Sequence, residues 1–462
     1  MTDYERLIPG FCKDILTMLT GAGYEAYVVG GAVRDMVMGR PISDFDITTS
    51  AFPEETCRVL ENCGIRYLTV GIKHGTVTAL IAGNEVEITS FRVDGKYSDL
   101  RRPDDVVFTR SKEEDVKRRD FTINAMYLGM NGEVIDLTGG LEDIRRKVIR
   151  AVGDPDVRFE EDALRIMRGL RFAAQTGFNI DDMTFSAMKS KAGSLKQISS
   201  ERIAVELNGL VMAPFASEVI RVSVPVLGII IPELEKCRGF DQRSKYHDKD
   251  VLEHTLAVLD GIPVDDKTGR RDLSLSLAAL FHDIGKPECF FLTPKGIGHM
   301  FGHPAKSAEI ADRVLTELKY PNDVKREVDV LVRYHDHYPS PEKSNVHRFI
   351  CDIGRDNADR LFILQKADIA AHAPEGRKRG ELLDEIIAAG KELEKEDAVY
   401  DVRDLRISGN DIIDLGVTPG PGVGKMLNEI FDAYIDGKIH NDHGELVSYA
   451  ARLRNINSLY KI

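Results

Sequence analysis

The sequence lacks any long hydrophobic run. The longest candidate, VSVPVLGIIIPEL from Val222, is interrupted by proline and falls short of the ~20 apolar residues that a membrane-spanning helix needs. The N-terminal stretch MTDYERLIPGFCKDILTML carries acidic and basic residues where a signal peptide has a continuous apolar core. Together these features predict a cytoplasmic protein with no membrane partner.

The cysteines also lack a functional pattern. There are six, with no CxxC pair and no compact framework. Such spacing favours free thiols in a reducing compartment over a disulfide scaffold or a zinc site.

An overall excess of positive charge is missing as well. The net charge is −13, which by itself opposes a nucleic-acid partner, because phosphate binding draws its affinity from Lys and Arg. Basic residues nevertheless concentrate near the N-terminus, at KRRD (117–120), at RRK (145–147), and at the arginines 150, 158, 165, 168 and 171. A solvated helix face would look similar, so this clustering alone identifies no partner.

What is present indicates an α+β multidomain chain. At ~150 residues per domain, 462 residues suggest about three units. Short strand patterns (EAYVV, RYLTV, TVTALIA, EVEITSF, AMYLGM) occupy the first third, and helical periodicity follows Gly153-Asp154-Pro155. We therefore predict an α/β head (1–150), an all-α neck (151–235), a second helical domain (236–390) and a helical tail (391–462).

The stretch YVVGGAVRDMVMGRPISDFDITTS contains the first candidate site. A strand ending at Gly30-Gly31 and opening a helix presents backbone N–H groups and a positive helix end, which suit a phosphate. A simple tight turn would read the same way, and the spacing is that of neither a dinucleotide fingerprint nor a Walker loop.

Three acidic residues strengthen this candidate. Asp44 and Asp46 are two apart, so an extended strand would direct both carboxylates to one face, as one or two Mg²⁺ ions require. Glu87 in EVEITSF could complete the metal site or accept a proton from an attacking hydroxyl. The alternative is an exposed strand edge.

Several motifs in fixed order resemble one family. GGAVRDMVMGRPISDFDITT is followed by VEITSFRVDGKYSDLRRPDDVVF, RRDFTINAMY, IDLTGGLEDIRRKVIRAVGDP and EDALRIMRGLRFAAQTGF. Over residues 25 to 215 this pattern is similar to the bacterial and eukaryotic type of CCA-adding tRNA nucleotidyltransferases and their sister poly(A) polymerases. The resemblance implies a polymerase-β-like nucleotidyltransferase head, then a neck, body and tail.

The resemblance also implies site residues and cofactors. Mg²⁺ at Asp44, Asp46 and Glu87 would promote attack of an RNA 3′ hydroxyl on the α-phosphorus, with pyrophosphate leaving. In RRDFTIN, Arg119, Asp120 and Asn124 would hold the triphosphate and ribose. The remaining nucleotide-binding candidates are Gly30, Gly31, Arg34, Asp162, Arg165, Arg168 and Arg171.

Base selection is expected at Asp162 and Arg165 in EDALR. Three residues apart, they should share one face of a helix, with Ile166, Leu170 and Ala173 on its packed side. A carboxylate beside a guanidinium complements the amine donor and ring acceptor of cytosine and adenine. The alternative is an ordinary surface ion pair, worth ~0.3 to 0.5 kcal/mol.

A loop at 93–108 is similar to the family's flexible loop. Asp94, Gly95 and either Arg101 or Arg102 are its expected functional members. Its full length favours addition of all three nucleotides.

A second cluster follows in the helical region. Seven of the twelve histidines lie between 247 and 337. The order His254, His282-Asp283, Asp368 resembles a metal-dependent HD phosphohydrolase, with His303 and His335 as second-metal ligands. Imidazole and carboxylate together suit Mn, Fe, Co, Ni or Zn. Many nucleotidyltransferases of this kind keep the domain only as a degenerate scaffold, but the full ligand set favours a working phosphohydrolase that acts on 2′,3′-cyclic or terminal phosphates of damaged RNA ends.

The sequence thus favours a tRNA nucleotidyltransferase that uses CTP and ATP. GPGVGK in the tail reads as a helix-opening turn within an RNA-binding segment. The alternatives are a poly(A) polymerase, an HD phosphohydrolase whose head only binds RNA, and a non-catalytic RNA-binding scaffold. Monomer and dimer both stay open.

Overall fold

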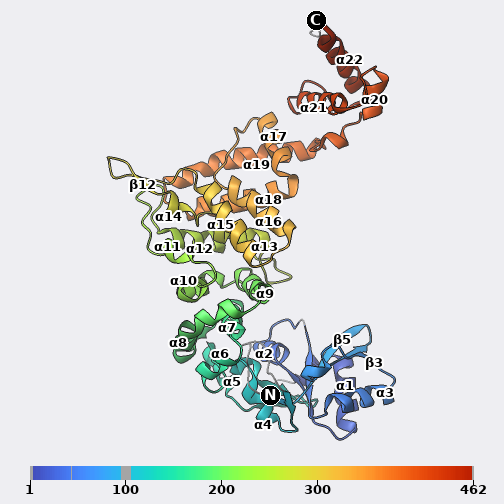
Figure 1. Ribbon diagram of the computed structural model, residues 1–462, viewed down its shortest axis with the longest axis vertical. Helices are drawn as coiled ribbons and strands as arrows, with labels where there is room; N and C mark the ends of the chain where they lie inside the picture. Colours follow the sequence, from blue (N-terminus) through green and yellow to red (C-terminus); the bar gives the residue numbers. More distant parts are fainter. Residues whose placement is uncertain (1–3, 43, 95–105, 460–462) are drawn as a thin grey trace. The chain divides into compact units, whose positions relative to one another are not determined.

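The computed structural model describes residues 4–42, 44–94 and 106–459 (Figure 1). It confirms the predicted α+β fold class, with one large sheet near the N-terminus and helices after it. The chain divides into two compact units. The first, here the N-terminal unit, contains residues up to Glu235 with 265–270 and 317–320, and the C-terminal unit contains the rest. The finer division into head, neck, body and tail stays a prediction.

The N-terminal unit is built on a seven-stranded mixed sheet of order β3-β4-β5-β2-β1-β8-β9. β2 runs parallel to β5, and the other neighbouring pairs are antiparallel. The seven strands are β1 (Ala26–Val29), β2 (Asp46–Thr49), β3 (Arg66–Leu68), β4 (Thr76–Ile81), β5 (Asn84–Ser90), β8 (Met126–Leu128) and β9 (Val134–Asp136). A separate hairpin pairs β6 (Arg92–Asp94) with β7 (Val106–Phe108).

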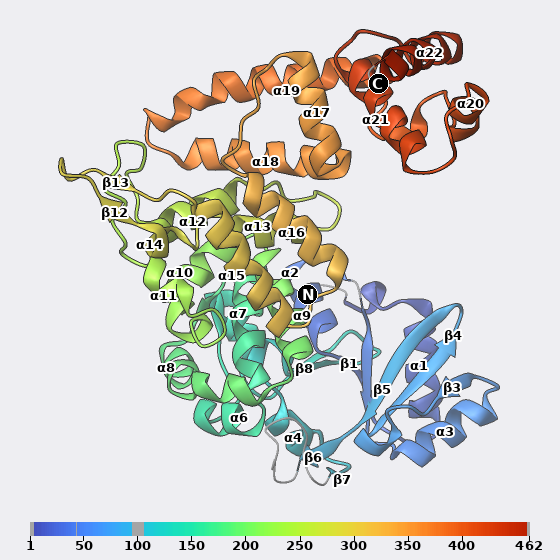
Figure 2. The same cartoon turned by 45° about the horizontal axis from the view of Figure 1, so that its top comes forward.

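Alternating side chains explain the sheet. In β4 every second residue is buried, because successive side chains of a strand point to opposite faces. Helices α1 (Gly10–Gly21) and α3 (Pro53–Asn62) pack beside the sheet (Figure 2). Leu16 of α1 and Ile47 of β2 are fully buried in the shared core. Burial of one such side chain contributes ~1.5 to 3 kcal/mol.

Helices complete the N-terminal unit. After the short segments α2 (Gly31–Met38), α4 (Lys112–Asp115) and α5 (Gly140–Arg146) come α6 (Pro155–Glu161), α7 (Leu164–Thr176), α8 (Asp182–Lys191), α9 (Ser200–Val211) and α10 (Ala216–Leu227). A two-residue pair, β10 (Val148–Ile149) and β11 (Asn179–Ile180), links them. α11 (Glu233–Cys237) spans the boundary between the units.

One prediction about these helices is wrong. Asp162 and Arg165 do not share a helix, because the helix is interrupted at Asp162, which has extended backbone angles (φ −139°, ψ 102°) between α6 and α7. Its Oδ1 accepts a hydrogen bond from Leu164 N at 3.0 Å. An aspartate that bonds nearby backbone N–H groups competes with helix continuation, which accounts for the break.

The C-terminal unit is helical. Its elements are α12 (Val251–Gly261), α13 (Leu273–Phe281), α14 (Lys286–Cys289), α15 (His303–Glu317), α16 (Asn322–Tyr334), α17 (Lys343–Ile353), α18 (Arg355–Ala371), α19 (Arg379–Lys395), α20 (Gly409–Asp414), α21 (Pro421–Ile435) and α22 (His443–Leu459), with the hairpin β12 (Phe291–Leu292) and β13 (Gly298–His299). α12 packs against α13 and α18. The tail has a core of its own, with Ile412, Ile430 and Leu446 fully buried.

Among the described residues, no helix is long and apolar enough to cross a bilayer. The cytoplasmic location stays a prediction.

Candidate active sites

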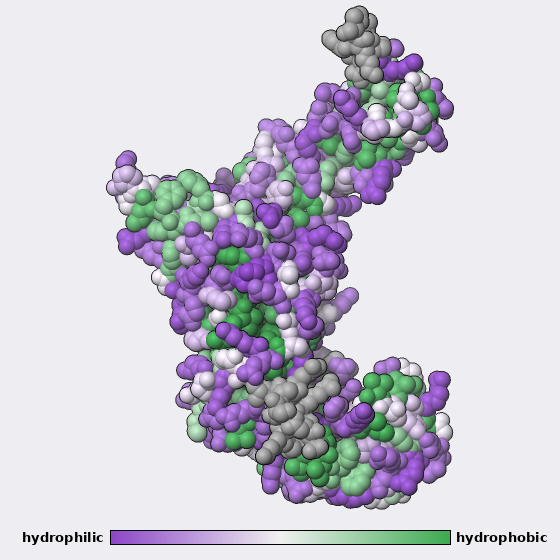
Figure 3. All heavy atoms as spheres, viewed as in Figure 1, coloured by the Kyte–Doolittle hydropathy of each residue, from purple (hydrophilic) through white to green (hydrophobic). Residues whose placement is uncertain are grey.

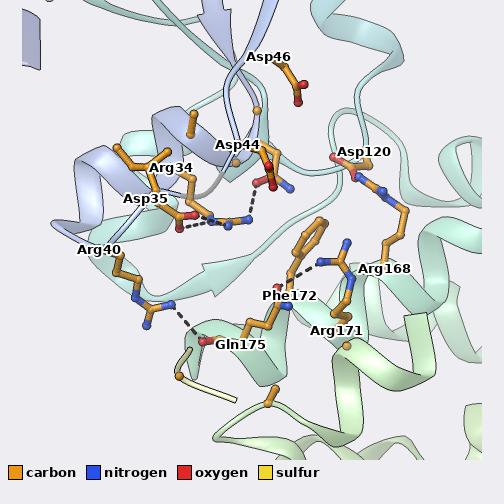
Figure 4. A pocket seen from close by; sticks show the side chains of 18 of the residues that line it. Arg34, Asp35, Arg40, Asp44, Asp46, Asp120, Arg168, Arg171, Phe172 and Gln175 are labelled. Carbon is orange, nitrogen blue, oxygen red and sulfur yellow. Dashed lines mark hydrogen bonds and ion pairs between the residues drawn. The ribbon is translucent and has the colours of Figure 1, made fainter. Parts of the chain in front are cut away.

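The predicted head residues line one cavity of the N-terminal unit, of about 1150 Å³ (Figure 4). Twelve of the thirteen contribute to its wall, although they come from separate elements: Gly30, Gly31, Arg34, Asp44, Asp46, Arg119, Asp120, Asn124, Asp162, Arg165, Arg168 and Arg171. Glu87 is the exception. The structure therefore brings the candidates together, while their individual roles stay predictions.

The three carboxylates converge from neighbouring segments. Asp46 begins β2, and because Ile47 pairs with Ile88 in parallel register, Asp46 lies beside Glu87 on the same face of the sheet. Asp44 precedes β2 rather than belonging to it, so the expected two-residue strand spacing is only partly right. Partial desolvation raises the pKa of Asp46, and the negative charges of Glu87 and Asp44 raise it further. The positive charge of Arg119 lowers this pKa, but by less than the other effects raise it.

Such mutual repulsion suits a divalent cation. Carboxylates that lie close together repel one another and are stabilised when a doubly charged ion joins them, and carboxylate oxygens are ligands that Mg²⁺ accepts. Asp44, Asp46 and Glu87 are therefore the residues that would hold Mg²⁺.

Gly30 fits the turn between β1 and α2. Its φ of +73° lies in the left-handed region, which strains any residue with a Cβ. A Cβ built there would also lie 3.9 Å from Asp46 Oδ2. That distance is ordinary van der Waals contact, so the left-handed φ is what requires glycine here, and the positive end of α2 that follows favours phosphate.

Arg34 is held in place by two neighbours. It is buried, its Nε and Nη2 each donate to Asp35 at 2.9 Å, and its Nη1 donates to Asn124 Oδ1 at 3.0 Å (Figure 4). A guanidinium fixed on two sides loses little rotamer freedom when it binds a further anion.

Phe172 organises three cavity arginines, a role that sequence reasoning missed. The guanidinium carbons of Arg34, Arg168 and Arg171 lie 5.4, 5.3 and 4.3 Å from its ring centroid. Each contact is a cation–π interaction. The i, i+4 spacing of Arg168 and Phe172 in RIMRGLRF was the available signal.

Asp115 is a second residue missed from the sequence. This fully buried carboxylate pairs with Arg118 (2.7 Å) and Arg119 (2.9 Å) and accepts a hydrogen bond from the Tyr127 hydroxyl (2.9 Å). Burial alone would raise its pKa, but Arg119 and Arg118 outweigh it and bring the pKa to about 2. Asp115 therefore fixes the arginines of RRDFTIN.

The Asp120 carboxylate forms an ion pair with Arg168. Two guanidinium nitrogens of Arg168 donate to its Oδ2 at 2.9 and 2.7 Å. Burial would raise the pKa of Asp120, yet the Arg168 charge keeps it below its ordinary value. A bound ribose would share this carboxylate with Arg168.

The predicted base-selecting residues have separate partners. Asp162 Oδ2 accepts a hydrogen bond from Arg202 at 3.2 Å, and Arg165 Nη1 donates to Glu161 at 2.7 Å. Arg165 also donates to the carbonyls of Arg158 and Arg118. Both residues face the cavity, but they do not form the ion pair that one helix face would have allowed.

The loop predicted at 93–108 is only partly described. Asp94 ends β6, whereas Gly95, Arg101 and Arg102 lie outside the described residues.

The C-terminal unit gathers all six predicted histidine and aspartate ligands. His254, His282 and Asp368 form one group, and Asp283, His303 and His335 another, with the ligand atoms of each within 4.8 Å of one another. Asp283 joins the groups, since its carboxylate lies 3.2 Å from both His282 Nε2 and His303 Nε2. These are the residues that would hold metal ions.

The histidine tautomers fit metal binding. The Nδ1 atoms of His282, His303 and His335 lie 2.7 to 2.9 Å from backbone carbonyl oxygens, which only accept, so each Nδ1 carries the proton. Each Nε2 lone pair is then directed at the cluster, the arrangement typical of metal-ligating histidine. Among the described residues, His282 Nε2 and Asp283 Oδ1 are buried without a hydrogen bond.

Three more residues of this cluster were missed. His247 and His372 form a third group with His254, and Lys286 Nζ lies 2.6 Å from Asp283 Oδ2. His372 follows Asp368 by four residues at the end of α18, so helical spacing could have revealed it. Lys286 adds a buried positive charge at the cavity wall.

This fold and the carboxylate-lined cavity define a nucleotidyltransferase. The chain matches the poly A polymerase head domain at residues 26–150, the "Probable RNA and SrmB- binding site of polymerase A" at 177–236, and tRNA nucleotidyltransferase domain 2 at 303–450. It is 36% identical over 444 residues to the CCA-adding enzyme of Leuconostoc mesenteroides, with 96% of each chain covered. The chain belongs to the CCA-adding enzyme family.

Other relatives agree. The CCA-adding enzyme of Streptococcus pyogenes serotype M2 is 35% identical over 454 residues, covering 96% of this chain and 95% of that one. The structure of the Bacillus stearothermophilus CCA-adding enzyme in complex with CTP superposes with a TM-score of 0.73 at 28% identity, covering 97% and 98% of the two chains. The HD assignment of the histidine cluster stays a prediction.

Proposed function

We propose that the chain adds or repairs the 3′-terminal CCA of tRNA, using CTP and ATP with Mg²⁺ in the head. The observation that carries this proposal is the single cavity lined by twelve candidates from separate elements, with Asp46 beside Glu87 at its edge. Family membership and the CTP bound by the Bacillus stearothermophilus relative support it.

The chemistry follows from the charges on the wall. Mg²⁺ at the carboxylates would neutralise the triphosphate and lower the pKa of the RNA 3′ hydroxyl. Arg34 and Arg119 bind the phosphates, and Glu87 either completes the metal site or accepts the hydroxyl proton. The bond from the 3′ oxygen to the α-phosphorus forms, the bond from the α-phosphorus to the bridging oxygen breaks, and pyrophosphate leaves with the electron pair.

Asp162 and Arg165 would select the base. Arg165 uses three of its five N–H donors on Arg158, Glu161 and Arg118, which leaves two for a ring nitrogen or carbonyl of the base. Asp162, steadied by Arg202, would accept the exocyclic amine of cytosine or adenine. Uracil and guanine present the reverse pattern, which places a carbonyl oxygen against the Asp162 carboxylate and an N–H group against the Arg165 guanidinium.

One incorporation assay tests this function. A tRNA lacking its CCA end should gain two cytidines and one adenosine when CTP and ATP are supplied, and nothing from UTP or GTP. Long adenosine tails made without CTP would instead identify a poly(A) polymerase. Combined Asp44→Ala and Asp46→Ala should abolish incorporation, whereas unchanged activity would leave the head with RNA binding only.

We further propose a second activity in the C-terminal unit, favoured by the six converging ligands and the three fixed tautomers. The substrates would be 2′,3′-cyclic or terminal phosphates of RNA ends. Mn, Fe, Co, Ni or Zn at the cluster would supply Lewis acidity and activate water. One water oxygen–phosphorus bond forms and one phosphorus–ester bond breaks, leaving a phosphate and a ribose hydroxyl.

The test is hydrolysis of adenosine 2′,3′-cyclic phosphate by metal-loaded protein. We expect activity that a chelator removes and one of these metals restores. Absence of hydrolysis with every metal, in protein shown to bind metal, would reduce the cluster to a structural role.

A further inference from the structure

An exposed aromatic hairpin lies at the mouth of the histidine-aspartate cavity. β12 and β13 pair with Phe291 opposite His299. Four large apolar side chains of this segment are strongly exposed: Phe291 (47%), Leu292 (54%), Ile297 (48%) and Phe301 (75%). Figure 3 shows hydrophobic surface gathered over this hairpin. Isolated exposed apolar residues are common, but several on one hairpin indicate a binding surface.

The rings of Phe291, His299 and Phe301 form a compact triad. The Phe291 and His299 rings are stacked, with centroids 5.7 Å apart and planes 26° apart, and the His299 and Phe301 rings are stacked at 5.1 Å and 23°. Phe291 and Phe301 lie 5.8 Å apart. Because Phe301 is the most exposed, its ring offers open area to a further planar group.

This aromatic group is continuous with the cluster. His299 and Phe301 line a cavity of about 470 Å³ that also contains Asp283, His303 and Asp368. His303 follows Phe301 by two residues, and its Nδ1 donates to the Met300 carbonyl at 2.9 Å. The rings and the ligands therefore share one short, hydrogen-bonded segment.

Cationic side chains supply the third component. Lys286, Arg333 and Arg379 line the same cavity. A cavity that joins flat aromatic surface, positive charge and a ligand cluster matches the parts of a nucleotide, namely a base, a phosphate and the ester bond between phosphate and sugar. A volume of about 470 Å³ falls in the usual range for small-molecule sites.

We propose that Phe301, backed by His299 and Phe291, is a stacking platform for the terminal nucleobase of an RNA end whose phosphate reaches the cluster. The proposal rests on the hydrolase activity proposed above and adds its substrate class: esters that carry a nucleobase are preferred over base-free phosphoesters. Base stacking on an aromatic side chain tolerates all four bases, so the preference is for a base and not for one sequence.

A fluorescence titration tests the platform without catalysis. The chain contains no tryptophan, so Phe301→Trp introduces a single indole at the site. Adenosine 2′-phosphate should quench its emission saturably, whereas glycerol 2-phosphate and inorganic phosphate should not. Absence of quenching, or equal quenching by glycerol 2-phosphate, would overturn the proposal.

Kinetics provide the second measurement. In metal-loaded protein, Phe301→Ala should raise KM for adenosine 2′,3′-cyclic phosphate about tenfold with kcat nearly unchanged, and should leave hydrolysis of a base-free phosphoester unaltered. Ile297→Ala is the matched control, since it is similarly exposed on the same hairpin but has no ring. An equal effect of the control would indicate a general apolar contact and refute stacking.

The two proposals fail separately. Quenching of the Phe301→Trp indole without hydrolysis of any ester would refute the hydrolase and retain the platform. Hydrolysis in which Phe301→Ala treats nucleotide and base-free esters as the wild type does would retain the hydrolase and refute the platform.

Discussion

Arg202 Nη2 lies 3.2 Å from Asp162 Oδ2, at the turn between α6 and α7. This contact joins the first half of α9 to the turn that precedes α7. The Asp162 carboxylate is therefore held by a residue forty positions away, and its direction in the cavity depends on two helices rather than one.

Asp162→Ala should relax base choice. Without the carboxylate, the exocyclic amine of cytosine loses its acceptor while uracil no longer places a carbonyl oxygen against an anion, so the ratio of kcat/KM for CTP over UTP should fall at least tenfold. Arg202→Gln should lower the same ratio by a smaller factor, because Asp162 remains but is less fixed. Single-nucleotide incorporation on a tRNA lacking its end measures both.

The control for this prediction is Glu142→Ala. Glu142 is an exposed carboxylate of α5, paired only with the exposed Arg145 and Arg146 among the described residues. Such pairs contribute little, so base choice should not change. Unaltered discrimination in Asp162→Ala would refute its part in base selection.

Phe172→Leu should weaken nucleotide binding more than it destabilises the fold. Leucine keeps most of the buried volume but removes the ring face that three guanidinium groups contact. We expect KM for CTP and ATP to rise about tenfold, with a loss of ~1 to 2 kcal/mol in the free energy of unfolding. Phe349→Leu, equally buried but in the C-terminal unit, should lose similar stability with no change in KM.

Much of this site could be predicted from the sequence, because its residues occur in contiguous motifs. The strands containing Val28, Val77 and Ile88 follow from alternation, and each falls where the pattern places it. Asp46 was recognisable as a candidate ligand from its two-residue spacing to Asp44. These features depend on local periodicity, which one sequence carries.

Partners distant in the chain were not predictable. Nothing in the periodicity shows that Asp162 ends a helix, since helix breaking there depends on a side-chain bond to Leu164 N. The contact of Arg202 with Asp162 also depends on tertiary packing. The spacing of Phe172 four residues after Arg168 fits a core aromatic as well as a guanidinium contact, so the structure was needed to distinguish the two.

Asp115→Asn should destabilise the chain in a pH-dependent way. The native pKa of Asp115 is about 2, below its ordinary value of 3.8, so its charge stabilises the folded state above the unfolded pKa. The difference of nearly two units corresponds to ~2 kcal/mol at pH 7. We expect that gap between wild type and variant from pH 7 to pH 5, and its progressive loss as the pH falls from about 4 toward 2.

Chemical denaturation at several pH values measures this gap. Glu113→Gln is the control, because Glu113 is exposed on the same short helix and should change stability by under ~0.5 kcal/mol. A gap that is independent of pH down to 3 would mean that Asp115 acts through packing rather than charge. CTP incorporation should also fall in Asp115→Asn, since Arg118 and Arg119 lose their common partner.

His282→Ala should separate the two units functionally. His282 Nε2 is buried beside Asp283 and Asp368, so its loss should abolish metal binding by the cluster, measured by metal content after dialysis and by calorimetric titration. CTP and ATP incorporation should remain within about twofold of wild type, because the carboxylates that serve it lie in the N-terminal unit.

The control is His347→Ala. His347 is equally buried, but its Nε2 lies 2.7 Å from the Val399 carbonyl, and it belongs to none of the three ligand groups found among the described residues. That variant should lose stability and keep its metal. A large loss of incorporation in folded His282→Ala would show that the cluster supports the head as well as its own site.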